Sequence, residues 1–144
     1  MEIRPFRSED EAAVVALWEA CGLVRPWNNP VKDIQRKLAA QPELFLVGCL
    51  ADRVVATVMA GYEGHRGWIN YLAVRPDHRR QGLGRQIMAA AEARLRQRHC
   101  PKINLQVRAA NRDVLAFYQR LGYAVDDVIS LGRRLENDAP DAPP

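Results

Sequence analysis

Two glycines in the stretch Arg79-Arg80-Gln81-Gly82-Leu83-Gly84 stand between an apolar, strand-like run, Ile69 to Val74, and a long amphipathic helical pattern. Where such a turn leads into a helix, several backbone N–H groups lack intrahelical partners and lie at the positive end of the helix dipole. A phosphate or pyrophosphate group suits this position. Arg79 and Arg80 add positive charge, so the segment predicts a site for a phosphorylated ligand.

Two familiar phosphate-binding motifs do not fit this turn. A Walker loop would place Lys and then Ser or Thr after the last glycine, where Arg85 and Gln86 stand. A dinucleotide-binding fingerprint would need a third glycine at the position of Ile87. By itself the turn therefore also fits an ordinary strand-to-helix connection whose glycines supply backbone freedom.

A second segment, 111–123, has the pattern of a capped helix followed by a strand, with Asn111 at the helix start and Gly122 at its end. Together with the run Leu72-Ala73-Val74-Arg75-Pro76, it resembles the GNAT superfamily of N-acetyltransferases, which bind acetyl-coenzyme A. Segments 23–28 and 61–67 are similar to those of YpeA-type members. The resemblance spans nearly the whole chain through the blocks Ile3-Arg4-Pro5-Phe6-Arg7, Val74-x-Pro76-x-x-Arg79-x-x-Gly82-x-Gly84 and Asn111 to Tyr123.

Apolar periodicity predicts an α/β (α+β) chain. The strand-helix-strand unit from Trp68 to Val107 indicates a parallel strand pair, whereas the preceding hairpin, Leu44–Leu50 and Val54–Ala60, is antiparallel. The resemblance implies a GNAT fold with a mixed, mostly antiparallel sheet of six to seven strands, a splayed central parallel pair and about four flanking helices. The last two strands are expected around Tyr123–Val125 and Val128–Leu135. Helices are expected before Gly22, over Val31–Ala40, over Gly82–Arg98 and up to Leu121.

The length of 144 residues and the 48% hydrophobic share predict one domain, over residues 1–135, with a disordered tail at 136–144. The apolar runs are too short to span a bilayer, and Glu2 and Arg4 stand where a secretory segment would be apolar. A cytoplasmic protein without a membrane partner is therefore expected. The three cysteines show no C-x-x-C spacing, which predicts neither a zinc site nor a disulfide framework, and no metal is expected.

The net charge of +4 is concentrated in arginines of the central segment, between positions 75 and 98. This bias could attract an anionic cofactor or a nucleic acid. The chain has no helix-turn-helix or RNP-like signature, so we expect no nucleic-acid partner. Exposed edge strands make a homodimer reasonable.

The resemblance also implies the contacts to acetyl-coenzyme A. Backbone N–H groups from the turn would hold the pyrophosphate, with Arg79 and Arg80 beside them, while the main chain of the preceding strand would pair with the pantetheine arm. Asn111 matches a family position that contacts this arm, although its role as a helix N-cap is an equally good explanation. The backbone groups concerned are those of Gln81, Gly82, Leu83, Gly84 and Arg85 in the turn, and of Leu72, Ala73 and Val74 in the strand.

Acetyl transfer needs a deprotonated amine, stabilisation of the oxyanion and a proton for the leaving thiolate. By resemblance, the N–H of Leu72 or of its neighbours polarises the thioester carbonyl, and Tyr118 donates to the sulfur. Because a tyrosine pKa of about 10 exceeds a thiol pKa of about 8.5, a hydrogen bond with later protonation by solvent is as plausible as full proton transfer. Tyr118 could alternatively be a packed interfacial tyrosine.

The general base departs from the family pattern. Many members carry a Glu two residues before the position of Leu72, where this chain has Asn70, which accepts no proton at neutral pH. Glu63 and His65 are the candidates, acting through water, although Glu63 also fits a solvated turn residue. Deprotonating a lysine at pH 7 costs about 4.6 kcal/mol and an α-amine only about 1 kcal/mol, so a weak base favours an acceptor of low pKa.

In such folds the acceptor lies between the loop joining the first two helices and the last hairpin. Trp27, Asn28, Asn70 and Asp126 are the predicted contacts, while a packed loop anchor and a turn residue are the alternatives for Trp27 and Asp126. The sequence thus predicts an acetyl-coenzyme A-dependent N-acetyltransferase that moves an acetyl group to a primary amine of a small molecule or protein. A non-catalytic acyl-coenzyme A-binding regulatory module is the alternative, which Asn70 keeps open.

Overall fold

The computed structural model describes residues 1–139. The described chain divides into two compact units, one of residues 1–105 with Asp138 and Ala139, the other of residues 106–137. The single domain predicted for residues 1–135 therefore stays a prediction. The elements of the first unit are β1 (Glu2–Pro5), α1 (Glu11–Ala20), α2 (Pro30–Ala40), β2 (Phe45–Leu50), β3 (Arg53–Tyr62), β4 (Gly67–Val74), α3 (Leu83–Gln97) and β5 (Ile103–Leu105), with short 3-10 helices η1 (Ser8–Asp10), η2 (Pro42–Leu44) and η3 (Pro76–His78).

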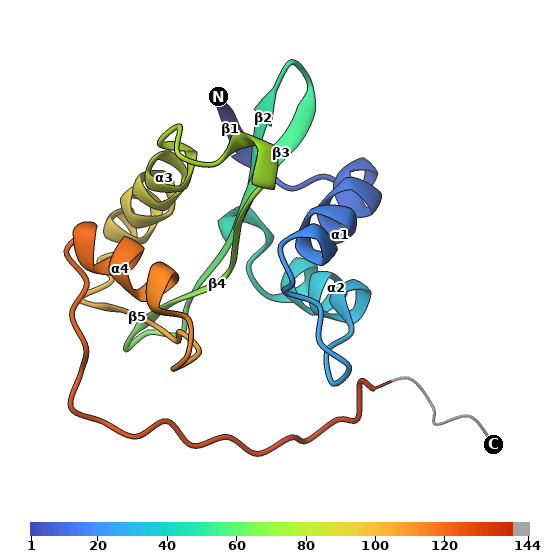
Figure 1. Ribbon diagram of the computed structural model, residues 1–144. Helices are drawn as coiled ribbons and strands as arrows, with labels where there is room; N and C mark the ends of the chain where they lie inside the picture. Colours follow the sequence, from blue (N-terminus) through green and yellow to red (C-terminus); the bar gives the residue numbers. More distant parts are fainter. Residues whose placement is uncertain (140–144) are drawn as a thin grey trace. The chain divides into compact units, whose positions relative to one another are not determined.

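The first unit is a mixed sheet with helices on both faces. Its strands follow the order β1-β2-β3-β4-β5, with antiparallel pairing as far as β4 and a parallel pair of β4 and β5. Helices α1 and α2 cover one face and α3 covers the other (Figure 1). The mixed, mostly antiparallel sheet agrees with the prediction, and so does the number of helices, since the second unit adds a fourth, α4 (Arg112–Arg120).

The number of strands was overestimated. The prediction was six to seven, but the described residues form five, because 123–125 and 128–135 adopt no strand. Apolar side chains in this stretch are 74–91% exposed, so it has no buried face. Strand preference depends on packing against neighbouring strands, and the apolar pattern alone was therefore misleading. The exposed side chains are those of Val125, Val128, Ile129, Leu131 and Leu135.

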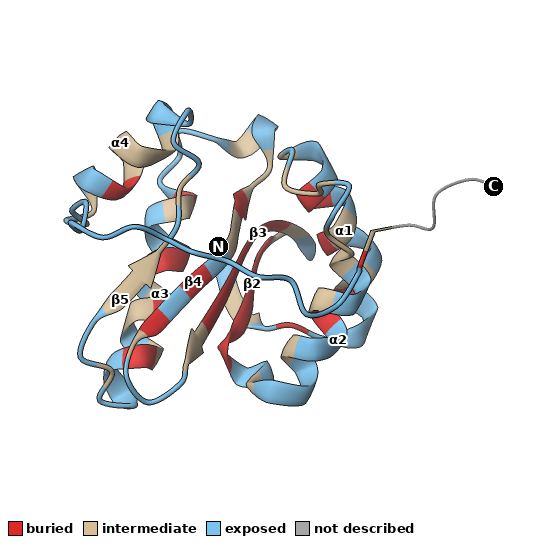
Figure 2. Cartoon of the chain, turned by 90° about the horizontal axis from the view of Figure 1, so that it is seen from below, coloured by how far each residue is buried: buried red, intermediate tan, exposed pale blue. Residues whose placement is uncertain are grey.

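The core lies on both sides of β2 and β3, which read as nearly continuous apolar runs because both their faces are covered. Figure 2 shows the buried residues gathered on these strands and on β4. On one face Phe6 and Phe45 stack at 4.6 Å between ring centroids, with Trp18 of α1 6.0 Å from Phe45. On the other, α3 buries one helical stripe, formed by Leu83, Ile87, Met88, Ala91 and Leu95.

The second unit contains α4 (Arg112–Arg120), which begins and ends as the sequence predicts. The side-chain oxygen of Asn111 accepts a hydrogen bond from the N–H of Val114 at 3.3 Å, which caps the helix. After the helix Gly122 adopts a left-handed conformation, with φ of 97°. The ring of Tyr118 meets those of Phe117 and Tyr123 edge to face, at 5.2 and 5.7 Å.

Part of the predicted tail is in contact with α2. Both oxygens of Asp138 accept hydrogen bonds from the guanidinium of Arg36, at 2.6 and 2.8 Å, and Asp138 is buried. The remainder of the predicted disordered tail, 140–144, lies outside the described residues. Within residues 1–139, no helix combines the length and apolarity that a membrane crossing requires.

A second ion pair joins β1 to the start of α1. Arg4 donates to both oxygens of Asp10, at 2.7 and 2.9 Å, and the N–H of Arg7 donates to the same carboxylate at 2.8 Å. These contacts, led by the hydrogen bond from Arg4, hold the pKa of Asp10 below its usual value despite burial. Because the folded-state pKa is depressed, the pair stabilises the fold above the unfolded-state pKa of about 3.9 and loses this effect as the pH falls through the folded-state value.

Replacing Arg4 should therefore destabilise the protein in a pH-dependent way. We expect Arg4→Met to lower the free energy of unfolding by about 2 kcal/mol at pH 7, as for other hydrogen bonds to charged groups, with a difference that shrinks below about pH 4. Urea unfolding measured between pH 7 and pH 2 checks this, with Arg53→Met, an exposed arginine of the β2–β3 hairpin, as the control. A difference that stays constant across this range would contradict the assignment.

Candidate functional site

The turn between β4 and α3 leaves the start of the helix open. The first intrahelical bond runs from the N–H of Gln86 to the carbonyl of Gly82, at 3.1 Å, so the preceding N–H groups of Leu83, Gly84 and Arg85 have no acceptor within the helix. Among the described residues no side chain caps this terminus. These donors point out at the positive end of the helix dipole and can bind an anion, as the sequence predicts.

The backbone conformation at position 82 explains why a glycine is found there. Its φ is 77°, in the left-handed region that side chains disfavour, and a Cβ atom built on it would meet nothing within 4 Å. Space is therefore no constraint at this position. Gly84 lies within the first turn of α3 and shows no such conformation, so its folding role is smaller.

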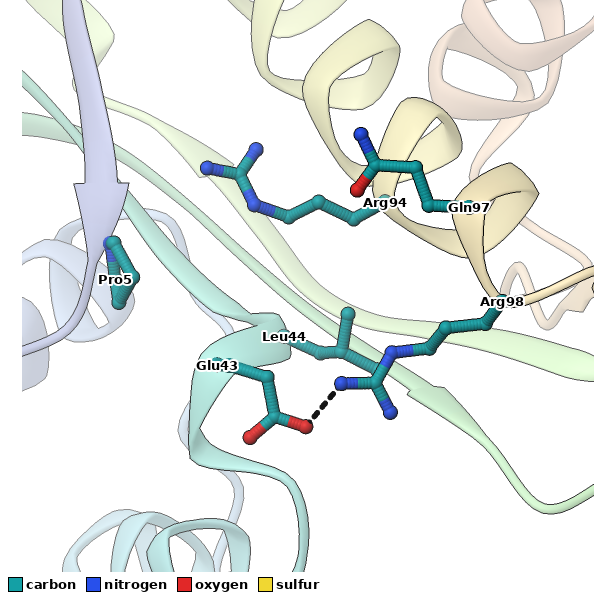
Figure 3. Close-up of a pocket in the computed structure, with 6 residues that line it drawn as sticks. All are labelled: Pro5, Glu43, Leu44, Arg94, Gln97 and Arg98. Carbon is teal, nitrogen blue, oxygen red and sulfur yellow. Dashed lines mark hydrogen bonds and ion pairs between the residues drawn. The ribbon is translucent and has the colours of Figure 1, made fainter.

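The arginines of the central segment divide between the two ends of α3. Arg79, Arg80 and Arg85 belong to the turn and the first helical turn, and Arg79 also contacts the thiol of Cys21 at 3.7 Å. Arg75, directly after β4, pairs with Asp77. Arg94, Arg96 and Arg98 lie about 16 Å farther along the helix. There Arg94 and Arg98 border a cavity of about 250 Å³ in which Arg98 pairs with Glu43 (Figure 3), lined by Pro5, Glu43, Leu44, Arg94, Gln97 and Arg98. The arginines at the far end of α3 are therefore too distant to contact a ligand at the turn.

Strand β4 contains one extra residue. Asn70 pairs with Met59 and Ala73 with Thr57, so three steps along β4 match two along β3. Tyr71, within this bulge, has a φ of 50°, which is uncommon for a residue other than glycine. The bulge interrupts the regular ladder immediately before Leu72, the predicted donor to the thioester.

Beyond the bulge, one edge of β4 has no neighbouring strand among those described. The parallel partner β5 pairs only with Gly67, Trp68 and Ile69, so the edge from 70 to 74 continues unpaired. At the far end, the carbonyl of Val74 accepts a hydrogen bond from Cys21 at 3.4 Å. An unpaired strand edge offers backbone donors and acceptors to an extended ligand. Because β5 ends at Leu105, the splaying of the parallel pair that the resemblance implies stays a prediction.

The bulge is fixed by side chains that the sequence analysis did not single out. The ring of Tyr71 stacks on Trp18 at 3.7 Å, and its hydroxyl donates to Asp33 of α2 at 2.5 Å. Burial, followed by the hydrogen bond to Asp33, raises the pKa of Tyr71 above its usual value. Thr57, fully buried on β3, donates to the carbonyl of Tyr71. A threonine within an otherwise apolar strand was the available signal.

The predicted bases lie at the other end of β4. One oxygen of Glu63 accepts hydrogen bonds from the N–H groups of His65, at 3.0 Å, and of Arg66, as a turn residue does. Leu72 stands five residues beyond the start of β4, about 16 Å along the strand. This distance excludes direct proton transfer from an amine near Leu72, so the roles of Glu63 and His65 stay predictions that need intervening water.

The predicted acceptor contacts fall on separate parts of the chain. Trp27 and Asn28 lie in the loop between α1 and α2, where Trp27 is 41% exposed and the N–H of Asn28 donates to Arg25 at 2.9 Å. Asn70 is an exposed residue of β4. Asp126 is an exposed residue of the second unit.

The other predicted residues of the second unit are Asn111 and Tyr118. Asn111 is the N-cap of α4, so that explanation of its presence is confirmed. Tyr118 is 6% exposed, and burial, followed by the neighbouring Tyr123, raises its pKa above the usual value. A tyrosine in this state keeps its proton at neutral pH and acts as a hydrogen-bond donor. Over residues 1–139, no cluster of three metal-ligating side chains is found.

Comparison with known proteins identifies what the chain is similar to. A model described as the acetyltransferase (GNAT) family matches residues 9–123. An acetyltransferase of Sodalis glossinidius is 49% identical over 139 residues, 96% of this chain and 98% of that protein. A similarity to YpeA-type members in particular stays a prediction.

Two solved structures share the fold. Ard1 from Thermoplasma volcanium has a TM-score of 0.76 at 25% identity, over 87% of this chain and 83% of that one. AAC(6')-Iy, in complex with the bisubstrate analog CoA-S-monomethyl-acetylneamine, has a TM-score of 0.75 at 15% identity, over 92% of this chain and 97% of that one.

The two glycines of the turn should respond differently to alanine. We expect Gly82→Ala to lower the free energy of unfolding by about 1–2 kcal/mol because of its left-handed φ. Gly82→Asn should cost less, since asparagine tolerates this conformation. Gly84→Ala should be neutral or stabilising by up to about 1 kcal/mol, because it lies in the helix. Denaturant unfolding of the three variants checks this, and a fully stable Gly82→Ala would rule out the left-handed turn.

Proposed function

Because the chain belongs to the acetyltransferase (GNAT) family, we propose that it transfers an acetyl group from acetyl-coenzyme A to a primary amine, by direct attack in a ternary complex. The observation that carries this proposal is the uncapped start of α3, where three consecutive N–H groups face outward beside arginines. This arrangement fits a diphosphate. It serves no evident purpose in the fold itself.

The turn and the edge of β4 supply the contacts to the cofactor. The N–H groups of Gln81, Gly82, Leu83, Gly84 and Arg85 would hold the pyrophosphate. A helix terminus favours an anion by about 0.3–2 kcal/mol, so hydrogen bonds and the charges of Arg79 and Arg80 must supply the rest. The unpaired edge from Leu72 through Ala73 to Val74 would hold the pantetheine arm, and Asn111 is proposed to contact this arm in addition to capping α4.

The chemistry divides between a backbone donor and a tyrosine. Acetyl-coenzyme A supplies the activated acetyl thioester. Leu72 would direct its N–H at the thioester carbonyl oxygen and stabilise the negative charge that develops there. Tyr118 would donate a hydrogen bond to the sulfur. Its raised pKa makes complete proton transfer to a thiolate less favourable than for an ordinary tyrosine, so the proton of the leaving thiol comes from solvent.

The acceptor amine must lose its proton without a nearby carboxylate on β4. Asn70 replaces the acidic residue of many family members, and the β3–β4 turn with Glu63 and His65 is about 16 Å away along the strand. We therefore propose that water takes the proton. The cost at pH 7 is about 1 kcal/mol for an α-amine and about 4.6 kcal/mol for a lysine, which favours acceptors of low pKa.

The acceptor would meet the loop between α1 and α2. The exposed indole of Trp27 is suited to pack against an acceptor or its cation, with Asn28 beside it and Asn70 on the strand. Asp126 is proposed to attract the ammonium form. A protein amine and a small-molecule amine both fit this description. On sequence grounds alone, we propose that the enzyme works in the cytoplasm, can form a homodimer, and has neither nucleic acid nor a membrane as its partner.

One observation favours a second candidate function, a non-catalytic acyl-coenzyme A-binding module. Such a module would use the same turn at α3 and need no base, which agrees with Asn70. The two candidates differ in turnover only. Steady acetylation of any amine would show that the protein is an enzyme.

Cofactor binding can be tested separately from folding. We expect coenzyme A and acetyl-coenzyme A to bind the wild-type protein saturably in calorimetry. Gly84→Ala, which should keep the fold intact, should weaken this binding by about tenfold or more, because a methyl group would obstruct the approach of the phosphates to the helix start. Arg53→Met serves as the charge control. If Gly84→Ala bound coenzyme A as tightly as the wild type, the pyrophosphate site would have to lie elsewhere. If the wild-type protein bound no coenzyme A, the proposed function would be wrong.

Turnover is tested with a panel of amines and detection of the released thiol. Peptides with a free N-terminus and small amines of low pKa should react faster than lysine side chains. Tyr118→Phe should reduce kcat by about 10²-fold, as the loss of a transition-state donor does, while leaving coenzyme A binding unchanged. Phe117→Leu, the neighbouring aromatic residue, is the control. An unaltered kcat in Tyr118→Phe would leave Tyr118 as a packing residue.

A further inference from the structure

We propose that Thr57 is a positioning residue for catalysis, whose buried hydroxyl fixes the Tyr71–Leu72 peptide and thereby aims the N–H of Leu72. The inference rests on the proposed function. Thr57 lies on β3, on the side of β4 opposite the open edge, and pairs with Ala73. Its effect would pass entirely through one peptide group.

The hydroxyl of Thr57 has a single orientation. Its oxygen accepts a hydrogen bond from Nε1 of Trp18 at 2.9 Å, and it donates its own proton to the carbonyl of Tyr71, also at 2.9 Å. Thr57 and Trp18 both have no exposed surface, so water cannot replace either bond. Because an indole N–H can only donate, the direction of both bonds is determined.

This bond replaces one that the strand ladder cannot make. The extra residue of β4 displaces the Tyr71 carbonyl from the regular pairing with β3, and a buried carbonyl without a partner is costly. The side-chain hydroxyl of Thr57, on β3, donates a hydrogen bond to this carbonyl. The hydroxyl of Thr57 thus stabilises the irregular backbone of the bulge by replacing a backbone hydrogen-bond donor.

The direction of the Leu72 N–H follows from peptide geometry. No peptide bond of the described chain is cis, and in a trans peptide the C=O of one residue and the N–H of the next point in opposite directions. The carbonyl of Tyr71 points toward β3, at Thr57. The N–H of Leu72 therefore points away from β3, toward the edge of β4 that has no neighbouring strand.

The next residues of β4 agree with this direction. The N–H of Arg75 donates to Val55 of β3 at 2.8 Å, and backbone groups alternate sides along a strand. Ala73 accordingly faces β3, and Leu72 and Val74 face the open edge. Trp18 adds a second restraint, because its ring stacks on Tyr71 while its N–H holds Thr57.

The test compares three variants in a protein that is shown to fold. Thr57→Val keeps the shape and removes the hydroxyl, Thr57→Ser restores it, and Trp18→Phe removes the indole N–H while keeping an aromatic ring. Complete loss of an oxyanion donor lowers kcat by about 10²–10³, so a misaimed one should lower it by about tenfold or more in Thr57→Val. The affinity for coenzyme A should not change. Thr57→Ser should recover most of the wild-type kcat, and the kcat of Trp18→Phe should lie between those of the wild type and Thr57→Val.

A second readout needs no acceptor. Acetyl-coenzyme A labelled with ¹³C at the acetyl carbonyl should show a downfield shift of its carbonyl resonance on binding to the wild-type protein, as the oxygen is polarised. The shift should be smaller with Thr57→Val and restored with Thr57→Ser. Val58→Ala, a fully buried neighbour whose side chain faces the other side of the sheet, should match the wild type despite being destabilised.

The outcomes separate this inference from the proposed function. If the wild-type protein binds no acetyl-coenzyme A, the proposed function fails. If it binds and turns over while Thr57→Val shows a wild-type kcat and carbonyl resonance, only the role of Thr57 is overturned. An equal loss in Thr57→Val and Val58→Ala would make the effect one of stability, and also overturns it. Should Thr57→Val not fold, Trp18→Phe provides the same comparison.

Discussion

The site depends on one constraint, which is that every buried backbone polar group of β4 needs a partner. A regular strand at this place would exchange hydrogen bonds with β3 and β5 along its whole length and offer nothing to a ligand. The extra residue at Tyr71 and the early end of β5 break this regularity on both sides of the strand. The buried hydroxyl of Thr57 then supplies a hydrogen bond that the strand ladder no longer provides. The backbone groups on the outer edge of β4 stay available to a ligand.

The two layers of helices serve different parts of the chemistry. On one face, α3 contributes its N-terminus and the arginines beside it, which suit the charged end of a cofactor. On the other, α1 and α2 contribute Trp18 and Asp33, which hold the bulge from behind. The sheet between them carries the strand edge that would lie between cofactor and acceptor (Figure 1). The same core that stabilises the fold thus determines the backbone geometry of the proposed reaction.

Electrostatics narrows the possible acceptors more than shape does. Asn70 provides no carboxylate on the strand, and Glu63 is engaged with backbone N–H groups of its own turn. Asp33 is hydrogen-bonded to the bulge, because it accepts a hydrogen bond from the hydroxyl of Tyr71. It also contacts Arg36 at 3.4 Å. An amine that loses its proton readily needs none of them, which is the reason for proposing acceptors of low pKa.

Local signals in the sequence determined the helices, the turn and the family. The glycine turn, the N-cap of α4 and the apolar stripe of α3 depend on residues close together in the chain, and the structure agrees with each. The number of strands and the support of the bulge were decided by tertiary structure. Strand formation by 123–135 depends on a neighbour that an apolar pattern cannot reveal. The role of Thr57 depends on contacts with residues 39 and 14 positions away, which appear only when three elements pack together.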